Sequence, residues 1–400
     1  MHDAIVVGAR CAGAPTAMLL ARRGHKVLMV DRSRFPSDVR HSTFLIHQPG
    51  VQRLQDWGLL DRIAATGCPA IRTLHVQMGP LVFRGSPPPA EGGQTNAYAP
   101  RRYVLDKILV DAAVEAGAEL REGVEVQEIL MDGDRVTGIR TADGIEEAKI
   151  VIGAEGVGSM VAKQVAAPEY DVRETRLSAC YSYFSGVEML EGVQAELYLA
   201  DHRAIFGWPT NDGKVIFGAN FQAHELEAVA KDPESHVFSV FEALAPDLYR
   251  RIRAGKREDD WVPGRLPRCF FRKPYGPGWA LVGDAGACYE YSTAQGITNA
   301  FRQVDFIAEA IDDGLTGRRP MEEALADFER RRNEAELPYY DFTYHQGTMQ
   351  PPDPSVLPVF AAVAQSPAAT SQFFGLFAQT THPAAFFAPE NIGKIMSGQI

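Results

Sequence analysis

A glycine-rich turn lies near the start of the chain, between an apolar run and a helix-like run. Residues 4–7 lead into Gly8-Ala9-Arg10-Cys11-Ala12-Gly13, and a second apolar run, 27–30, ends at Asp31. Gly8 permits a tight turn, Gly13 lets the helix pack close to the strand, and the helix N-terminus offers N–H groups to a pyrophosphate. Asp31 stands where an acid accepts hydrogen bonds from an adenosine ribose. The spacing predicts a nucleotide-binding βαβ unit.

The turn departs from the usual pattern at Arg10, which replaces the middle glycine. An arginine at this position can contribute a cation to the phosphates. Turns of this kind also occur without a ligand, but Pro15 early in the helix and Gly24 near its end agree with the strand, turn and acid. This agreement favours nucleotide binding over a purely structural turn.

A second motif of similar type lies near residue 283. The apolar run 279–282 ends at Gly283-Asp284, and residues 293–300 open a long helical pattern at Gly296. The chain therefore offers a second helix N-terminus to another part of one extended ligand. A dinucleotide with a large redox head fits that arrangement.

Composition excludes several other classes of protein. The 400 residues carry a net charge of −11, which argues against a general nucleic-acid binder. The five scattered cysteines imply neither a disulfide framework nor a metal site. No apolar run reaches the roughly 18 residues of a membrane span, and the chain opens directly on a strand. We expect a cytoplasmic protein, a monomer or homodimer, that acts on a small molecule.

Hydrophobic periodicity predicts the remaining elements. Helices are expected over 49–63, 102–116, 296–313 and 321–337, and strands over 73–83, 124–130, 136–141 and 148–152. Strand patterns dominate from 177 to 221, with a hairpin at Asn211-Asp212-Gly213. The aromatic-rich tail from residue 338 is expected to be packed.

Three motifs in this order resemble those of the single-component FAD-dependent monooxygenases, the para-hydroxybenzoate hydroxylase-like superfamily. The first is Gly8 to Gly13 with Asp31. The second, 153–159, is similar to the family's Asp-Gly turn, and the third, 281–285 with 295–297, is similar to its Gly-Asp motif. The resemblance covers about residues 3–335 and implies an α/β fold, with a Rossmann-type FAD-binding domain, an interleaved β-sheet substrate domain and a helical C-terminal region.

The implied domains alternate along the chain. The FAD-binding domain takes residues 1–72, 98–172 and 269–337, the substrate domain takes 73–97 and a β-rich 173–268, and 338–400 form the C-terminal segment.

The resemblance also implies roles for individual residues. Arg102 would reach the cofactor phosphates, Asp284 would bind the ribityl chain or pyrophosphate, and the N–H groups at Gly296 would stabilise negative charge on the reduced flavin. The expected cofactor-binding residues are Gly8, Arg10, Ala12, Gly13, Asp31, Arg32, Arg102, Val126, Asp284, Gly296 and Ile297.

Two departures concern the site itself. Glu155 replaces the usual aspartate of the middle motif, which leaves its role open. The family commonly has a proline shortly before the final Gly-Ile, where this chain has Glu290-Tyr291-Ser292. We expect a reaction chamber of different shape and polarity at this loop.

The implied activity is insertion of one oxygen atom of O₂ into an apolar, aromatic or polycyclic small molecule, with NADH or NADPH as reductant and a flavin C4a-hydroperoxide as oxygen donor. The expected substrate residues are Tyr183, Phe206, Trp208, Phe217 and Tyr291, and Tyr181 and Asn220 lie on the same strands. His47, His202, Glu290 and Tyr291 could act as acids or bases by chemistry alone, so no catalytic residue is assigned.

Other functions remain open. A reductase or dehydrogenase of the geranylgeranyl reductase-like branch shares the first and third motifs, and oxygen consumption distinguishes it. A halogenase is disfavoured because Phe206-Gly207-Trp208-Pro209 lacks the Trp-x-Trp-x-Ile-Pro signature. A non-catalytic flavin-binding protein is the third alternative.

Overall fold

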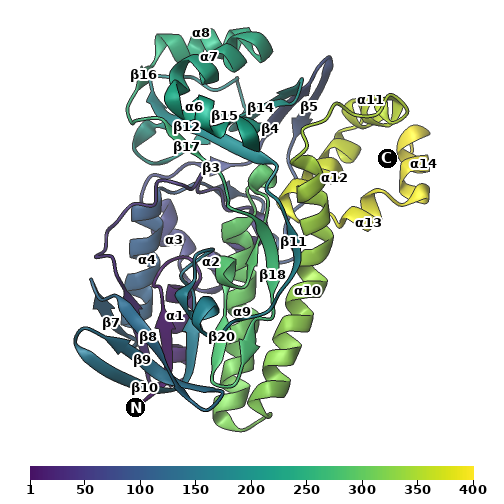
Figure 1. Ribbon diagram of the computed structural model, residues 1–400. Helices are drawn as coiled ribbons and strands as arrows, with labels where there is room; N and C mark the ends of the chain where they lie inside the picture. Colours follow the sequence, from purple (N-terminus) through teal and green to yellow (C-terminus); the bar gives the residue numbers. More distant parts are fainter.

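The computed structural model describes residues 1–400, which form two large sheets and a helical C-terminal segment (Figure 1). Five parallel strands make the centre of the first sheet, in the order β20-β10-β1-β2-β7. In that order they span Trp279–Leu281, Gly144–Gly153, His2–Val7, Val27–Asp31 and Glu119–Glu122. At the margins, β19 (Tyr275–Gly276) pairs with β20, and β8 (Val126–Asp132) pairs with β9 (Arg135–Thr141), which pairs with β10.

Helices cover one face of this sheet and short elements cover the other. The first layer contains α1 (Gly13–Arg22), α2 (Gln48–Asp56), α3 (Leu60–Ala64), α4 (Arg102–Glu115), α9 (Gly296–Thr316) and the start of α10 (Met321–Gln346). The β8–β9 ladder and α5 (Met160–Gln164) pack on the opposite face. Since β1 lies between β2 and β10, a crevice opens at its carboxyl end, where α1 begins.

The second sheet has the order β16-β12-β15-β14-β13-β4-β5, with β17 beside β12. Its strands span Lys256–Arg257, Leu177–Ser185, Val215–Gln222, Arg203–Pro209, Ala195–Ala200, Leu74–Met78, Leu81–Gly85 and, for β17, Val262–Gly264. Its outer face packs against α6 (Leu226–Lys231), α7 (Pro233–Leu244) and α8 (Pro246–Ala254), at the top of Figure 1. Its inner face is turned toward the first sheet.

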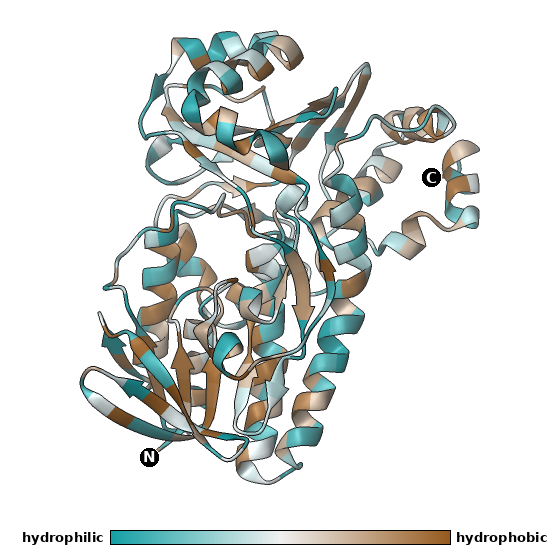
Figure 2. Ribbon diagram, in the orientation of Figure 1, coloured by the Kyte–Doolittle hydropathy of each residue, from teal (hydrophilic) through white to brown (hydrophobic).

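Two small sheets and the C-terminal helices complete the fold. The strands β3 (Ala70–Ile71) and β6 (Ala97–Tyr98) pair with each other, and β11 (Glu169–Arg173), β18 (Cys269–Arg272) and β21 (Ala287–Cys288) form a three-stranded sheet. The C-terminal helices are α11 (Leu357–Gln365), α12 (Pro367–Ala378), α13 (Pro383–Phe386) and α14 (Pro389–Met396). Figure 2 shows brown residues along α11, and its apolar residues pack with α12 against β4 and β5.

The architecture confirms the predicted α/β fold class, but some elements differ from the sequence-based expectation. The helix expected over 49–63 is divided into α2 and α3 at Gly58, whose φ is +78°. Helix α10 continues through Pro338 to Gln346, because buried residues beyond the proline, including Tyr340 and Phe342, hold it in place. Helices α6, α7 and α8 lie in the region expected to be β-rich.

None of the helices combines the length and the apolar character needed to cross a membrane.

Candidate active site

A cavity of about 1970 Å³ lies between the carboxyl edge of the first sheet and the inner face of the second. The β1–α1 turn, the end of β2 and the start of α9 line one side of it, and strands of the second sheet line the other. Drug-sized ligands occupy sites of roughly 300–1,000 Å³. The cavity therefore has room for an extended cofactor together with a second molecule.

The β1–α1 turn leaves no space for a side chain at Gly8 or Gly13. Gly8 has a φ of +93°, and a Cβ at this residue would lie 2.8 Å from the carbonyl oxygen of Ala154. A Cβ on Gly13 would lie 1.8 Å from the carbonyl oxygen of Gly8. No side chain caps the N-terminus of α1 at Ala12, which lines the cavity. The open helix end can therefore bind phosphate through its N–H groups.

Asp31, at the end of β2, is held in position by the backbone on both sides. Its two carboxylate oxygens accept hydrogen bonds from the N–H groups of Ala9 and Ser33, each at 2.8 Å. A carboxylate offers about four lone-pair sites, so both oxygens can still accept from a pair of hydroxyl groups. Arg32 and Val126 line the cavity beside it, and Arg32 is exposed to solvent. This corner suits the diol of a ribose.

Arg10 and Arg102 share one buried carboxylate. Arg102 donates to both oxygens of Asp106 at 3.1 Å, and Arg10 donates to the same group at 2.7 Å. The Asp106 side chain is fully buried, and Arg10 is further fixed by the hydroxyl groups of Ser33 and Ser37. Two guanidinium groups against one carboxylate leave one net positive charge at the cavity wall. The pair can thus balance the charge of a phosphate group.

The turn after β20 supplies a carboxyl group, that of Asp284, whose pKa is raised. Gly283 adopts a φ of +65° and donates its N–H to the side chain of Gln303 at 2.8 Å. Asp284 follows it and lines the cavity. Burial raises the pKa of Asp284 to about 6, and the positive charge of Arg102 acts in the opposite direction. The carboxyl group can therefore accept hydrogen bonds from a polar ligand near neutral pH.

The start of α9 is a second open helix N-terminus. No side chain caps it at Gln295, and a Cβ on Gly296 would meet no atom within 4 Å. Gly296 and Ile297 line the cavity at this point. His47 also lines the cavity but is largely buried, and its Nε2 is hydrogen-bonded to the carbonyl oxygen of Thr293 at 2.9 Å. Burial lowers the pKa of His47 to about 4, so the ring is neutral at pH 7.

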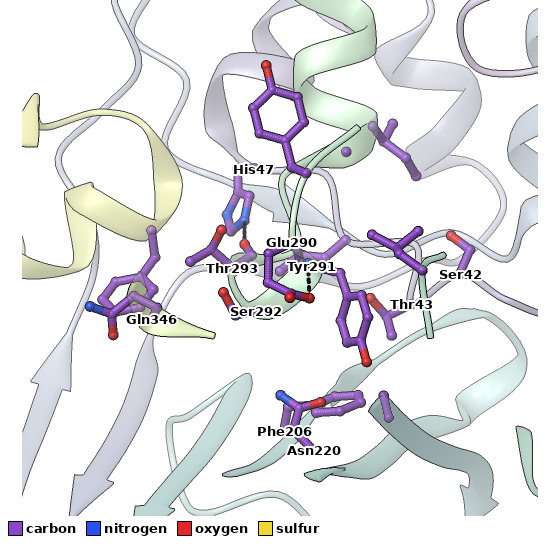
Figure 3. Close-up of a pocket in the computed structure, with 18 of the residues that line it drawn as sticks. Ser42, Thr43, His47, Phe206, Asn220, Glu290, Tyr291, Ser292, Thr293 and Gln346 are labelled. Carbon is purple, nitrogen blue, oxygen red and sulfur yellow. Dashed lines mark hydrogen bonds between the residues drawn. The ribbon is translucent and has the colours of Figure 1, made fainter. Parts of the chain in front are cut away.

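The loop that carries Glu290, Tyr291 and Ser292 joins the two sides of the cavity (Figure 3). Glu290 is 1% exposed and accepts hydrogen bonds from the N–H of Arg176 at 2.7 Å and the hydroxyl of Thr175 at 3.1 Å. Burial raises the pKa of its carboxyl group. These contacts tie the loop to the chain that leads into β12. Tyr291 points toward the second sheet, and its hydroxyl group has no hydrogen-bond partner.

Strand register decides which aromatic residues face the cavity. Phe206 pairs with Gly218 and Leu197, and Trp208 follows two residues later on the same face. Both line the cavity with Tyr181 and Asn220. Phe217 pairs with Gly207 instead, so it points to the outer face and packs with α7 and α8. The expectation that Phe217 contacts substrate is therefore wrong.

Tyr183 lies on the inner face but is covered by other side chains. Its ring stacks on Phe44 at 5.9 Å, and the guanidinium of Arg101 lies 3.9 Å from its centroid. It does not line the cavity, which again differs from the expectation. His202 lies in the exposed turn between β13 and β14 and does not line the cavity, although Asp201 beside it does.

The structure brings almost all of the expected cofactor residues to one wall. Gly13 stands immediately behind that wall, and the others line the cavity: Gly8, Arg10, Ala12, Asp31, Arg32, Arg102, Val126, Asp284, Gly296 and Ile297. Glu155, whose role the sequence left open, caps α5: it accepts from the hydroxyl of Ser159 at 2.7 Å and from two backbone N–H groups. Sequence reasoning did not name Asp106. It did expect an aromatic tail, and the structure places Phe360, Phe373 and Phe377 of α11 and α12 at the cavity.

The polar groups of this wall fit a flavin dinucleotide: two open helix ends, a diol-binding carboxylate and two arginines that share one buried carboxylate. Residues 1–236 match a family model described as an FAD binding domain. The chain belongs to this family of flavoproteins. The match confirms the resemblance to the para-hydroxybenzoate hydroxylase-like superfamily.

Curated relatives of the flavoprotein have several activities. Digeranylgeranylglycerophospholipid reductase 2 of Methanothermobacter thermautotrophicus is 26% identical over 339 residues, which are 80% of each chain. The protein FixC of Salmonella typhi is 30% identical over 169 residues, so the match spans only 39% of that relative's length.

Solved structures agree with the flavoprotein fold over nearly the whole chain. The flavin-dependent brominase Bmp2 superimposes with a TM-score of 0.82 at 18% identity, covering 100% of this chain and 98% of Bmp2. PqsL of P. aeruginosa, in complex with 2-aminobenzoylacetate, gives 0.74 at 18% identity and covers 94% and 99%. At such identities the likeness shows the fold alone.

Proposed function

We propose that the protein is an FAD-dependent monooxygenase that uses NADH or NADPH and O₂ to oxygenate an apolar small molecule. The observation that carries the proposal is the chamber in which an open helix end, at Gly296, faces the apolar inner side of the second sheet. When bound, FAD supplies electron transfer from the nicotinamide and the activation of O₂. The protein must exclude water and hold the substrate beside the flavin.

The residues of the chamber suit these tasks. Phe206 and Trp208 present apolar rings, and the indole N–H of Trp208 is satisfied by the carbonyl oxygen of Thr43 at 3.1 Å. The N–H groups at Gly296 and Ile297 would stabilise negative charge at the pyrimidine edge of the reduced flavin. Tyr291 and Asn220 line the chamber with polar atoms that have no hydrogen-bond partner, so they can orient a substrate. No side chain is assigned as a catalytic acid or base.

The domain division is part of the proposal. Residues 1–72, 98–172 and 269–337 would bind FAD, 73–97 and 173–268 would form the substrate wall, and residues from 338 onward would close the chamber. Helix α10 crosses the proposed boundary at 337, which links the cofactor wall to the C-terminal segment.

A flavin-dependent reductase is the second candidate. It is favoured by the 26% identity to a digeranylgeranylglycerophospholipid reductase over 80% of both chains. A reductase transfers electrons to an alkene and consumes no O₂, whereas a monooxygenase consumes one O₂ for each product. Oxygen uptake therefore separates the two candidates.

The first experiment is the visible absorption spectrum of the purified protein, before and after anaerobic addition of NADPH or NADH. We expect two flavin bands that bleach with the reductant and return when air is admitted. An oxygen electrode then measures uptake with each candidate substrate and with catalase, which corrects for peroxide. Product that contains ¹⁸O from ¹⁸O₂ supports the monooxygenase. A reduced product that forms equally without oxygen contradicts it and supports the reductase.

A further inference from the structure

The cavity does not end at the flavin-binding wall. Beyond the chamber it continues over the inner face of β13, β4 and β5, beneath helices α11 and α12. We call this extension the apolar arm. Its floor and roof are apolar, with Leu199 and Met78 among the strand residues and Phe360, Phe373 and Phe377 among the helix residues.

Strand register makes the floor of the arm continuous with the chamber. Asn220 pairs with Ala204, Ala204 with Leu199, and Leu199 with Met78. Directly paired residues lie on the same face, so these four side chains form one row across β15, β14, β13 and β4. Three intervals of about 4.8 Å give the row a length of about 14 Å. The space above it suits an elongated ligand.

Only the first member of the row is polar. Asn220 is 7% exposed and its Oδ1 has no hydrogen-bond partner. The hydroxyl of Tyr291 is also buried without a partner, and Figure 3 shows it directed toward Asn220 and Phe206 from the opposite side of the cavity. Buried polar groups in folded proteins normally have partners, so this pair points to a ligand that supplies them. The remainder of the row offers no polar contact.

We propose that the substrate is amphipathic, with a hydrogen-bonding head group between Tyr291 and Asn220 and an apolar chain along the arm. The proposal rests on the proposed function, because the head group would lie beside the flavin. A chain that extends over about 14 Å contains on the order of ten carbon atoms. The substrate class is thus a hydroxylated molecule with a long apolar tail rather than a single small ring.

The outer end of the arm supports an apolar route of entry. Val356, Leu357 and Phe387 line the cavity and are 39%, 42% and 51% exposed. Large apolar side chains at the mouth of a cavity favour the approach of an apolar molecule over that of a charged one. A tail can therefore reach the arm from this side.

The test uses the flavin-loaded protein and a series of 4-n-alkylphenols, from 4-methylphenol to 4-decylphenol. Binding is measured from the perturbation of the flavin absorption bands, which needs no turnover. We expect Kd to fall about fourfold for each added methylene until the arm is filled, because each methylene leaves water for an apolar surface. A Kd that does not depend on chain length overturns the proposal.

Two variants locate the tail. Ala361→Trp on α11 and Leu199→Trp on β13 each place an indole in the arm from opposite walls. Either should weaken 4-octylphenol binding at least tenfold and leave 4-methylphenol within twofold of the wild-type Kd. Ala368→Trp is the matched control, because Ala368 is exposed on α12 and does not line the cavity. Unchanged octylphenol binding in both blocked variants, with normal flavin content, overturns the assignment of the arm.

Oxygen uptake with the same phenols is recorded separately. If binding depends on chain length but no oxygen is taken up, the result supports the proposed role of the arm and contradicts the proposed monooxygenase activity. If oxygen uptake does not depend on chain length, the result supports the proposed monooxygenase activity and contradicts the proposed role of the arm.

Discussion

The cofactor wall and the substrate wall of this flavoprotein are built in different ways. The cofactor wall consists mainly of backbone groups and glycines. These residues lie within short motifs such as 8–13 and 283–284. At the substrate wall, apolar side chains from six strands and several helices meet because of strand register and long-range packing. The cofactor wall depends on main-chain geometry, whereas the substrate wall depends on which face of a strand each side chain occupies.

The two walls should tolerate substitutions differently. Two backbone segments that touch cannot accept even one added carbon atom, whereas neighbouring apolar side chains can repack after a substitution of similar volume. Substitutions of the closely packed glycines in the cofactor wall should therefore lower flavin content and stability together. Variants of the substrate wall should separate stability from ligand binding.

The largest effect is expected for Gly13→Ala. Its Cβ would lie 1.8 Å from the carbonyl oxygen of Gly8, and Gly8 is itself packed against Ala154. Helix α1 must move away from β1, at a cost of about 3 kcal/mol, the upper end of the usual range for overpacking. We expect protein with little bound flavin and a lower urea midpoint.

Gly393→Ala is the matched control for that substitution. Gly393 lies within α14, is exposed, and a Cβ there would meet no atom within 4 Å. This change should leave flavin content unchanged and raise stability by about 0.5–1 kcal/mol. A Gly13→Ala protein with full flavin content would show that the close contact between β1 and α1 is not required.

The same contrast explains what the sequence could predict. The turn at Gly8, the acid at Asp31 and the helix start at Gly296 are local patterns, so their place at one wall follows from the fold class. The face that Phe217 occupies depends on the register of β14 and β15, which a single strand pattern leaves open. The roles of Glu155 and Glu290 as backbone acceptors depend on loops whose conformation only the assembled fold defines.

A smaller effect, with opposite signs for stability and binding, is expected for Asp284→Asn. Because burial raises the pKa of Asp284 to about 6, the carboxylate opposes folding of the flavin-free protein above that pH. In urea unfolding at pH 8 the variant should be more stable than the wild type, by of order 1 kcal/mol. The difference should shrink as the pH falls through 6 and vanish below the ordinary aspartate pKa of 3.8.

Flavin affinity should change in the other direction for the same variant. The carboxylate is the proposed acceptor for hydroxyl groups of the cofactor, and its replacement by an amide should weaken FAD binding on the order of tenfold. Titration of the flavin-free protein with FAD measures this loss. Equal FAD affinity in variant and wild type would show that Asp284 does not bind the cofactor.

The smallest effect compares the two faces of one sheet through Phe217→Leu and Phe206→Leu. Phe217 is fully buried on the outer face, so its truncation should lower the free energy of unfolding by about 1 kcal/mol and leave 4-alkylphenol binding unchanged. Phe206 lines the cavity from the inner face, so its truncation should change the Kd of the phenols with a smaller loss of stability. Urea unfolding and flavin absorption titrations measure the two quantities on the same samples. The ring of Phe217 lies against Gly207, and the ring of Phe206 lies against Gly218. If Phe217→Leu altered ligand binding as much as Phe206→Leu, the two faces of the sheet would be coupled through these glycines.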